Sequence, residues 1–379
     1  MRILQIYELN PFESIGGVEG VVFALSKELV KMGHEVTILT GAGKEKKAVS
    51  RDGVDIISFD LFNTMKYTYR SGTLTPLRQL LFLTSVLAKN LDLKYDIYHG
   101  HIYTSGLLAN YFARKYNGIA VNTIHGSYYP VWDRLTNPLA AFFYRIMERQ
   151  IATMLAKHSH LQLHVSTYFA EQVSAWGGEV KVIPNGVDTG VFNNGVSSKF
   201  HSRLPVVLTA RRLVRKNGLE YLIKAMDHLR GECDLFIIGE GPEQHRLKLM
   251  AKNNDNIKFL GAIPHTEMPS YISGSDIVVI PSIIEASSLF MLEAMAAGKS
   301  VIASDVGGLP EILGDSGKLV PPMNPERLSG AIRELLNDAE KRRQLGISAQ
   351  RRVSENYTWH NIANKIEEEY QRLWRQKHA

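Results

Sequence analysis

The sequence predicts an α/β protein made of two doubly wound parallel-sheet domains that face a central cleft. Its strands are short continuous apolar runs, such as residues 277–280, which is typical of parallel sheets covered on both faces. Helical patterns alternate with these strands, and the alternation restarts after residues 185–204, a stretch rich in Gly, Asn and Ser. We therefore expect domains at 1–184 and 205–358 joined by that linker, with a closing helix at 359–379 that returns to the first domain. The length of 379 residues fits two domains of about 150–190 residues.

The composition is that of an ordinary globular protein, with 45% hydrophobic and 22% charged residues. The net charge of +6 is spread evenly along the chain, which argues against a nucleic-acid-binding arm. A single cysteine, Cys233, cannot form an internal disulfide and indicates a reducing, cytoplasmic setting. The first residues enter a strand without a signal-peptide pattern, and the longest apolar stretch, 80–88, is far shorter than the ~20 residues of a membrane span.

The first domain opens with a strand at 2–7, a loop containing Gly16 and Gly17, a helix at 18–32 and a strand at 34–40. The loop lacks the three-glycine dinucleotide fingerprint, so no NAD site is expected. Gly16 and Gly17 can still let the backbone approach a ligand closely, since neither has a Cβ. The alternative is a simple turn before a helix.

Three histidines follow predicted strands. The strand 95–98 leads into His99 and His101, and the strand 120–124 leads into His125. The carboxyl ends of parallel strands are where open sheets bind ligands, so a hydrogen-bonding role in a cleft is the first reading and a structural role the second. A metal site is not expected, because the chain has no H-E-x-x-H pattern and its one cysteine is distant in sequence.

A predicted amphipathic helix at 79–91 has a strongly apolar face. Such a face packs on a core or contacts a membrane surface or a lipid-linked acceptor. The basic residues Lys44, Lys46 and Lys47 and the tyrosine- and arginine-bearing segment 65–70 would then lie near an anionic surface. Peripheral contact with the inner face of a membrane is therefore one hypothesis for this domain.

The second domain restarts with a strand at 204–209, followed by a basic loop of four residues: Arg211, Arg212, Arg215 and Lys216. Such a charge run is either a solvated surface or, because it directly follows a strand, a phosphate-binding loop.

The stretch 276–312 carries two carboxylates between consecutive strands, Glu285 in a loop and Glu293 on the helix 288–297. A helix N-terminus presents free N–H groups and a partial positive charge, so it favours an anion. Two carboxylates beside an anion site suit a ligand with hydroxyls and a phosphate, such as a nucleotide sugar. Alternatively, one or both are ordinary solvent-facing residues of a helix start.

These motifs together resemble glycosyltransferase family 4, a family of retaining enzymes with the two-domain GT-B fold of Rossmann-like halves. The resemblance covers nearly the whole chain in order. The matching pieces are the Gly16-Gly17-Val18-Glu19 loop, DIYHGH, TIHG with His125, VIPNGVD at 182–188, RLVRKNG from Arg212, FIIGEGP, the pair Glu285 and Glu293, and DVGGLPEI.

The resemblance implies transfer of a sugar from a nucleotide diphosphate sugar, UDP before GDP, to a hydroxyl of a glycan or lipid-linked acceptor. It implies front-face substitution with no metal and no further cofactor. Glu285 would then orient the donor sugar through its hydroxyls rather than act as a nucleophile.

Further site residues follow from the same resemblance, residue by residue. Glu293 would bind the ribose hydroxyls, and His125 would lie near the reacting sugar. Arg212 and a nearby lysine would clamp the diphosphate. Backbone N–H groups complete the expected donor site, from Gly16 and Gly17 and from the turn of Ser288, Leu289 and Phe290.

Two departures from the family pattern stand out. The lysine expected five positions after Arg212 is Asn217 here, with Lys216 one position earlier. The loop after Glu285 reads Ala-Ser-Ser at 286–288, where the family is usually glycine-rich. Other activities on the same fold stay open: a nucleotide-sugar epimerase, a phosphorylase, or a non-catalytic nucleotide-sugar-binding member.

Overall fold

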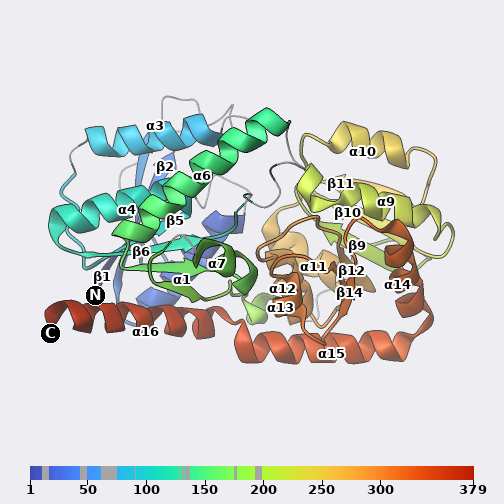
Figure 1. Ribbon diagram of the computed structural model, residues 1–379. Helices are drawn as coiled ribbons and strands as arrows, with labels where there is room; N and C mark the ends of the chain where they lie inside the picture. Colours follow the sequence, from blue (N-terminus) through green and yellow to red (C-terminus); the bar gives the residue numbers. More distant parts are fainter. Residues whose placement is uncertain are drawn as a thin grey trace. The chain divides into compact units, whose positions relative to one another are not determined.

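The computed structural model describes residues 1–10, 17–42, 49–60, 75–89, 91–127, 129, 132, 137–174, 177–192 and 199–379. The chain divides into two compact units (Figure 1). Unit 1 comprises Met1–Asn185 with Trp359–Ala379, and unit 2 comprises Gly186–Thr358. The last helix, α16 (Trp359–His378), therefore belongs to the N-terminal unit, as predicted.

Unit 1 is built on an eight-stranded sheet in the order β3-β4-β2-β1-β5-β6-β7-β8, parallel except for the β3–β4 pair. The strands are β1 (Arg2–Tyr7), β2 (Glu35–Ala42), β3 (Val49–Arg51), β4 (Val54–Asp60), β5 (Ile97–His101), β6 (Ile119–Ile124), β7 (Leu161–His164) and β8 (Val180–Val182). The order reverses between β1 and β5, and such a reversal opens a crevice at the carboxyl ends of the strands.

Helices cover both faces of this sheet. They are α1 (Gly17–Lys31), α3 (Thr75–Ala88), α4 (Ile102–Tyr116), α6 (Pro138–His158), α7 (Thr167–Ser174) and α16. On one face Ile3 of β1 packs in a cluster with Leu25 of α1 and Tyr370 of α16. On the other, Leu4 packs with Phe82 of α3 and residues of α4. Successive residues of one strand thus enter opposite cores, which is why the strands read as unbroken apolar runs.

Unit 2 is a six-stranded, all-parallel sheet in the order β11-β10-β9-β12-β13-β14. Its strands are β9 (Val206–Ala210), β10 (Asp234–Ile238), β11 (Ile257–Gly261), β12 (Ile277–Ile280), β13 (Ser300–Ser304) and β14 (Lys318–Val320). Its helices are α8 (Thr189–Phe192), α9 (Leu219–Asp227), α10 (Gln244–Ala251), α11 (Met268–Ser273), α12 (Leu289–Ala296), α13 (Leu309–Leu313), α14 (Pro325–Asn337) and α15 (Ala339–Asn356), with short 3₁₀ turns η2 (Arg215–Asn217) and η3 (His265–Glu267). The strand order reverses between β9 and β12.

The predicted linker at 185–204 is wrong for its first residues. Val187 and Phe192 are buried in a core cluster of unit 2, and Phe192 is the last residue of α8. The backbone N–H of Val187 also donates to the carbonyl of Tyr357 at 2.8 Å. The prediction failed because it relied on the polar composition of the whole stretch, which does not show that two apolar residues within it pack in the core of unit 2.

The helix predicted at 79–91 begins earlier, at Thr75, and ends at Ala88. Phe82 and Val86 on its apolar face are 0% and 1% exposed in the core of unit 1, so that face is a core face rather than a membrane face. Gly16, Lys44, Lys46, Lys47 and the segment 65–70 lie outside the described residues. None of the helices in the described part of the chain has the length and hydropathy to cross a membrane.

Candidate active site

The loops after β9 and β12 meet at the strand-order reversal of unit 2, where ligands bind in open α/β sheets. The backbone N–H of Ile283 donates to the carbonyl of Lys216 at 2.8 Å. Gly218 has a φ of +66°, and a Cβ there would lie 1.9 Å from the carbonyl oxygen of Pro281. Only glycine tolerates both conditions. The RKNG motif therefore serves to bring the two loops together.

The carboxylate of Glu285 forms an ion pair with the guanidinium of Arg211, the first residue after β9. Their side chains are only 13% and 7% exposed. Ser282 Oγ donates to the same carboxylate at 3.3 Å. Nε and Nη1 of Arg211 are buried and have no hydrogen-bond partner among the described residues. A desolvated guanidinium with unused donors suits a further anionic ligand, because arginine binds carboxylate and phosphate oxygens in pairs.

The backbone of Glu285 is held by the DVGGLPEI motif. Its carbonyl accepts from the N–H of Gly308 at 3.0 Å. Gly307 has a φ of +56°, and a Cβ there would lie 1.9 Å from that same carbonyl oxygen. This motif therefore fixes the position of Glu285 from the loop after β13.

The structure places the two neighbouring arginines of this loop in different surroundings. Arg212 is exposed, whereas Arg211 is the residue that reaches Glu285. The five-position spacing expected between the family arginine and lysine is met by Arg211 and Lys216. Asn217, which looked like a missing lysine, is buried, and its Nδ2 donates to the carbonyl of Arg212 at 2.7 Å.

The predicted turn before α12 and the second glutamate lie on the same element. Ser288 is the N-cap of α12, and its side chain accepts from the N–H of Met291 at 3.3 Å. Leu289 and Phe290 form the first turn and pack against the core of unit 2. Glu293, one turn further, is buried, and its Oε1 lies 2.7 Å from Nε2 of His265. The hydrogen bond to Glu293 raises the pKa of His265 above its ordinary value.

Unit 1 has its own group of polar side chains at the carboxyl ends of β5 and β6. Nε2 of His101 lies 2.7 Å from Oε1 of Gln5, and Nδ1 of His101 lies 3.0 Å from Nε2 of His125. Burial lowers the pKa of His125 to about 3 and that of His101 well below its ordinary value, so both rings are neutral near pH 7. With the Gln5 oxygen as acceptor, His101 donates from Nε2 and accepts from Nε2 of His125.

This assignment leaves Nδ1 of His125 as an acceptor, and that atom is buried without a partner among the described residues. His99, by contrast, is fully buried between Tyr370 Oη at 2.5 Å and Thr123 Oγ1 at 2.6 Å. Its role is structural. Within the described ranges no three His, Cys, Asp or Glu side chains are arranged to hold a metal.

Gly17 begins α1, directly beyond the loop that follows β1, and is exposed. Reasoning from the sequence named Arg211 and His101 but not their partners Glu285 and His125, and it missed His265 as the partner of Glu293. The five-residue spacing to Lys216 was a usable signal for Arg211. No sequence signal linked His265 to Glu293, because 28 positions separate them.

Two family models match the chain, one after the other. Residues 15–191 match the model described as Glycosyltransferase Family 4, and residues 194–352 match that described as Glycosyl transferases group 1. The chain is 26% identical to a phosphatidylinositol N-acetylglucosaminyltransferase subunit of Arabidopsis thaliana, over 98% of this chain and 82% of that protein.

Solved structures have the same architecture. Sucrose-phosphate synthase from Thermosynechococcus elongatus superposes with a TM-score of 0.86 at 23% identity, covering 99% of both chains. Anabaena HepE in complex with UDP and glucose superposes with a TM-score of 0.73 at 19% identity, covering 97% of this chain and 99% of that one.

The fold is therefore that of the GT-B glycosyltransferases, and the protein is a glycosyltransferase. Within that class the chain belongs to glycosyltransferase family 4.

Proposed function

We propose that this chain is a retaining glycosyltransferase that moves a sugar from a nucleotide diphosphate sugar to a hydroxyl of a glycan or lipid-linked acceptor. The proposed donor is a UDP sugar in preference to a GDP sugar, and the reaction uses no metal ion. The observation that carries the proposal is the buried pair of Arg211 and Glu285 at the β9–β12 reversal. Its unused guanidinium donors suit a diphosphate, and its carboxylate suits sugar hydroxyls.

Arg211 and Lys216 would bind the diphosphate oxygens. Negative charge grows on the leaving diphosphate as the glycosidic bond breaks, and fixed cations stabilise that charge without reorganising. N–H groups at the start of α12, from Ser288 to Phe290, would add hydrogen bonds to the same oxygens. Because these groups already neutralise the leaving group, the proposal requires no metal ion.

Glu293 would accept hydrogen bonds from the ribose hydroxyls, with His265 holding its carboxylate in place. Glu285 would orient the donor sugar. It is not assigned as a nucleophile, because it is already committed to an ion pair with Arg211. Retention then follows from front-face attack, in which the acceptor hydroxyl enters on the side of the leaving phosphate and gives its proton to a phosphate oxygen.

His125 would accept a hydrogen bond from a donor-sugar hydroxyl at Nδ1. A neutral ring is required for this, and burial supplies it by lowering the pKa of His125 to about 3. Gln5 and His101 would keep Nδ1 unprotonated by fixing the tautomer through Nε2 of His125. Gly16 and Gly17 are proposed to offer backbone N–H groups to the donor from unit 1.

UDP is favoured by the likeness to Anabaena HepE, which was solved in complex with UDP and glucose. A lipid-linked acceptor is favoured by the Arabidopsis relative, whose name specifies phosphatidylinositol. We place the acceptor site in unit 1 and the enzyme in the cytoplasm, at the inner face of a membrane.

A thermal-shift panel of UDP, GDP and ADP and their glucose, N-acetylglucosamine and mannose sugars, each with and without EDTA, tests the donor proposal. We expect one UDP series to raise the melting temperature equally in both conditions. Stabilisation that vanishes in EDTA would contradict the metal-independent site. An inverted product anomer, measured by NMR of the isolated glycoside, would contradict the front-face mechanism.

A further inference from the structure

Helix α6 of unit 1 is apolar on two opposite sides. Its inner side contributes Ala141, Ala152 and Leu155, which are buried, and the helix contacts α4. Its outer side carries large apolar residues that stay exposed: Leu139, Phe142, Phe143, Ile146, Met147 and Met154. Phe142 and Phe143 are each 60% exposed. An ordinary surface helix has a polar outer face, so this one requires an explanation.

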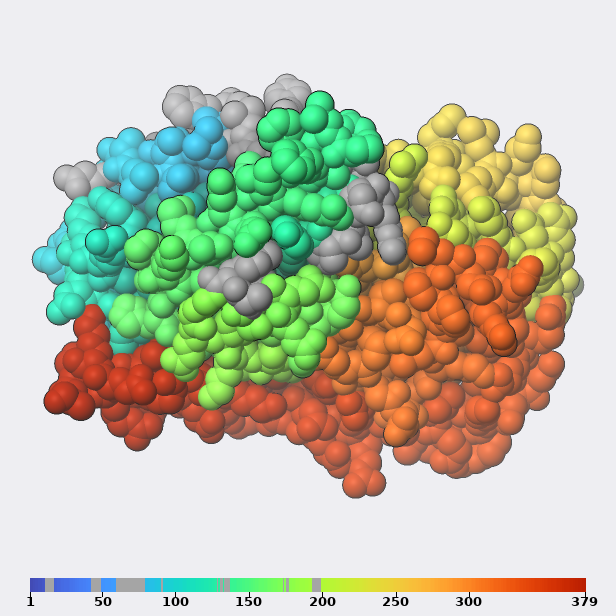
Figure 2. All heavy atoms as spheres, in the orientation of Figure 1, coloured from blue at the N-terminus to red at the C-terminus, as the bar shows by residue number. Residues whose placement is uncertain are grey.

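The exposed residues form one stripe rather than a scatter. Positions 139, 142, 143, 146 and 147 follow the i, i+3, i+4, i+7, i+8 spacing of a single helix face, and Met154 lies on the same face beyond the polar Gln150. Figure 2 shows the green helix on the surface of unit 1. The apolar part of this face runs for about two and a half turns, from Leu139 to Met147, and Met154 resumes it beyond Gln150. An exposed apolar face of this length is large enough to dock on another surface.

Cations flank this stripe, and no exposed carboxylate accompanies them on the helix. Arg149 and Lys157 are exposed. The one acid of α6 is Glu148, which is buried on the inner side. Its carboxylate accepts hydrogen bonds from Tyr103 at 2.8 Å, Ser127 at 2.7 Å and Trp132 at 2.7 Å. The outer face is therefore apolar and positively charged.

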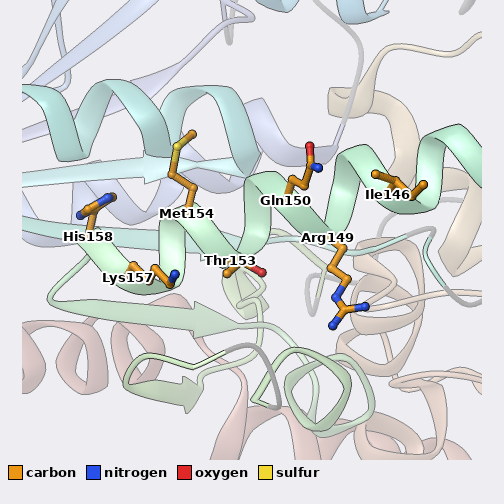
Figure 3. A pocket seen from close by; sticks show the side chains of 7 residues that line it. All are labelled: Ile146, Arg149, Gln150, Thr153, Met154, Lys157 and His158. Carbon is orange, nitrogen blue, oxygen red and sulfur yellow. The ribbon is translucent and has the colours of Figure 1, made fainter.

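A hollow of about 580 Å³ lies along the same face (Figure 3). It is lined by Ile146, Arg149, Gln150, Thr153, Met154, Lys157 and His158. In Figure 3, Gln150 and Met154 project to one side of the helix and Arg149 to the other. The hollow thus combines apolar side chains with two permanent cations, a combination that suits an amphiphile with an anionic headgroup.

We propose that the outer face of α6 docks on an anionic phospholipid surface, with the Leu139–Met154 stripe entering the headgroup boundary and Arg149 and Lys157 contacting lipid phosphates. Interfacial helices combine these features: aromatic and aliphatic residues on one side with lysine or arginine beside them. Charge complementarity selects this occupant over a second copy of the chain. A symmetric dimer through α6 would bring the same cations together with no exposed helix carboxylate to pair them.

This inference deepens the proposed lipid-linked acceptor by naming the surface that brings the enzyme to it. It rests on residues of unit 1, whereas the proposed donor site rests on Arg211, Glu285 and Glu293 of unit 2. The two can therefore fail separately.

Flotation of the full chain with vesicles tests the proposal directly. Vesicles of phosphatidylcholine with about one-third phosphatidylglycerol are compared with pure phosphatidylcholine, at low and physiological salt. We expect binding to the anionic vesicles that weakens with salt. The double variant Phe142→Ser/Phe143→Ser should lower the partition coefficient at least tenfold. Arg149→Gln and Lys157→Gln should lower it about fivefold each, as expected for one basic residue at an anionic surface.

Matched controls come from unit 2. Leu249→Ser changes an apolar residue that is 54% exposed, and Lys252→Gln changes an exposed cation. Both should bind vesicles as the wild type does. A gain-of-signal variant, Phe142→Trp, should show a blue-shifted fluorescence change on adding anionic vesicles, and Leu249→Trp should not. Donor-dependent thermal stabilisation is measured for every variant, so loss of vesicle binding with an intact donor response isolates the lipid surface from the donor site.

Three outcomes would overturn the proposal. One is vesicle binding by Phe142→Ser/Phe143→Ser equal to that of the wild type. Another is the absence of binding to anionic vesicles by the folded wild-type chain. The third is a concentration-dependent dimer in light scattering that Phe142→Ser/Phe143→Ser abolishes, which would make a second copy the occupant of this face.

Discussion

Replacing Arg211 should weaken donor binding far more than replacing Arg212, although the two arginines are neighbours in sequence. The guanidinium of Arg211 is buried beside Glu285, and two of its nitrogens have no hydrogen-bond partner among the described residues, whereas Arg212 is exposed. A hydrogen bond to a charged group contributes about 1.5–3 kcal/mol, so Arg211→Gln should raise the dissociation constant of the nucleotide diphosphate by roughly 10- to 150-fold. Arg212→Gln should change it by less than about threefold, as expected for an exposed charge.

Isothermal titration with the nucleotide that stabilises the wild type measures both constants. Removing one partner of a buried ion pair leaves the other uncompensated, so Arg211→Gln will also lower the stability of unit 2. Arg211→Lys keeps the charge and controls for this effect, and circular dichroism verifies folding at the titration temperature. A larger loss of affinity in Arg212→Gln than in a folded Arg211→Gln would refute the assignment.

Three further predictions address the remaining site residues and the buried histidines. Glu293→Ala should weaken nucleotide binding by about 1.5–3 kcal/mol, measured by titration. Glu285→Gln should lower donor turnover more than it lowers nucleotide affinity. If both variants lose the same nucleotide affinity and neither loses turnover beyond that, this division of roles is wrong. Burial lowers the pKa of His99 to about 3 and that of His164 to about 4, from an ordinary 6.5. Below pH 6.5 these two histidines therefore bind protons in the unfolded chain but not in the folded chain. The free energy of unfolding that they contribute above pH 6.5 is lost as the pH falls. At about pH 5 each of these two histidines should lower the free energy of unfolding in urea by about 2 kcal/mol, and His164→Phe should remove its share of that pH dependence. A pH-independent unfolding free energy between about pH 7 and 5 would contradict the neutral buried rings.

The architecture, and the edge of the sheet at which the candidate site lies, could be predicted from local sequence patterns. Continuous apolar runs such as 277–280 report a sheet buried on both faces, and residues next to such runs in sequence lie at its carboxyl edge. Glu285, Ser288 and Glu293 could be assigned in this way, because loop and helix positions after a strand follow directly from chain order.

The register between neighbouring strands, and the pairing of side chains far apart in sequence, could not be predicted from local patterns. Arg211 and Arg212 are indistinguishable by composition, and only the direction of the chain as it leaves β9 sends Arg211 to Glu285. Likewise, His101 meets His125 through two neighbouring strands, β5 and β6, whose register places their ends together.

The sequence by itself determined the two parallel-sheet units, the family and the residue types that a nucleotide sugar requires, because each of these depends on chain order and short-range periodicity. The tertiary structure decided which arginine pairs with Glu285, that Val187 and Phe192 anchor the supposed linker, and which side of each helix faces outward. Residues 79–91 and α6 show the physical reason. Both are apolar in sequence, yet Phe82 is buried in the core while Phe142 is exposed, since burial depends on what packs against a helix and not on the helix alone.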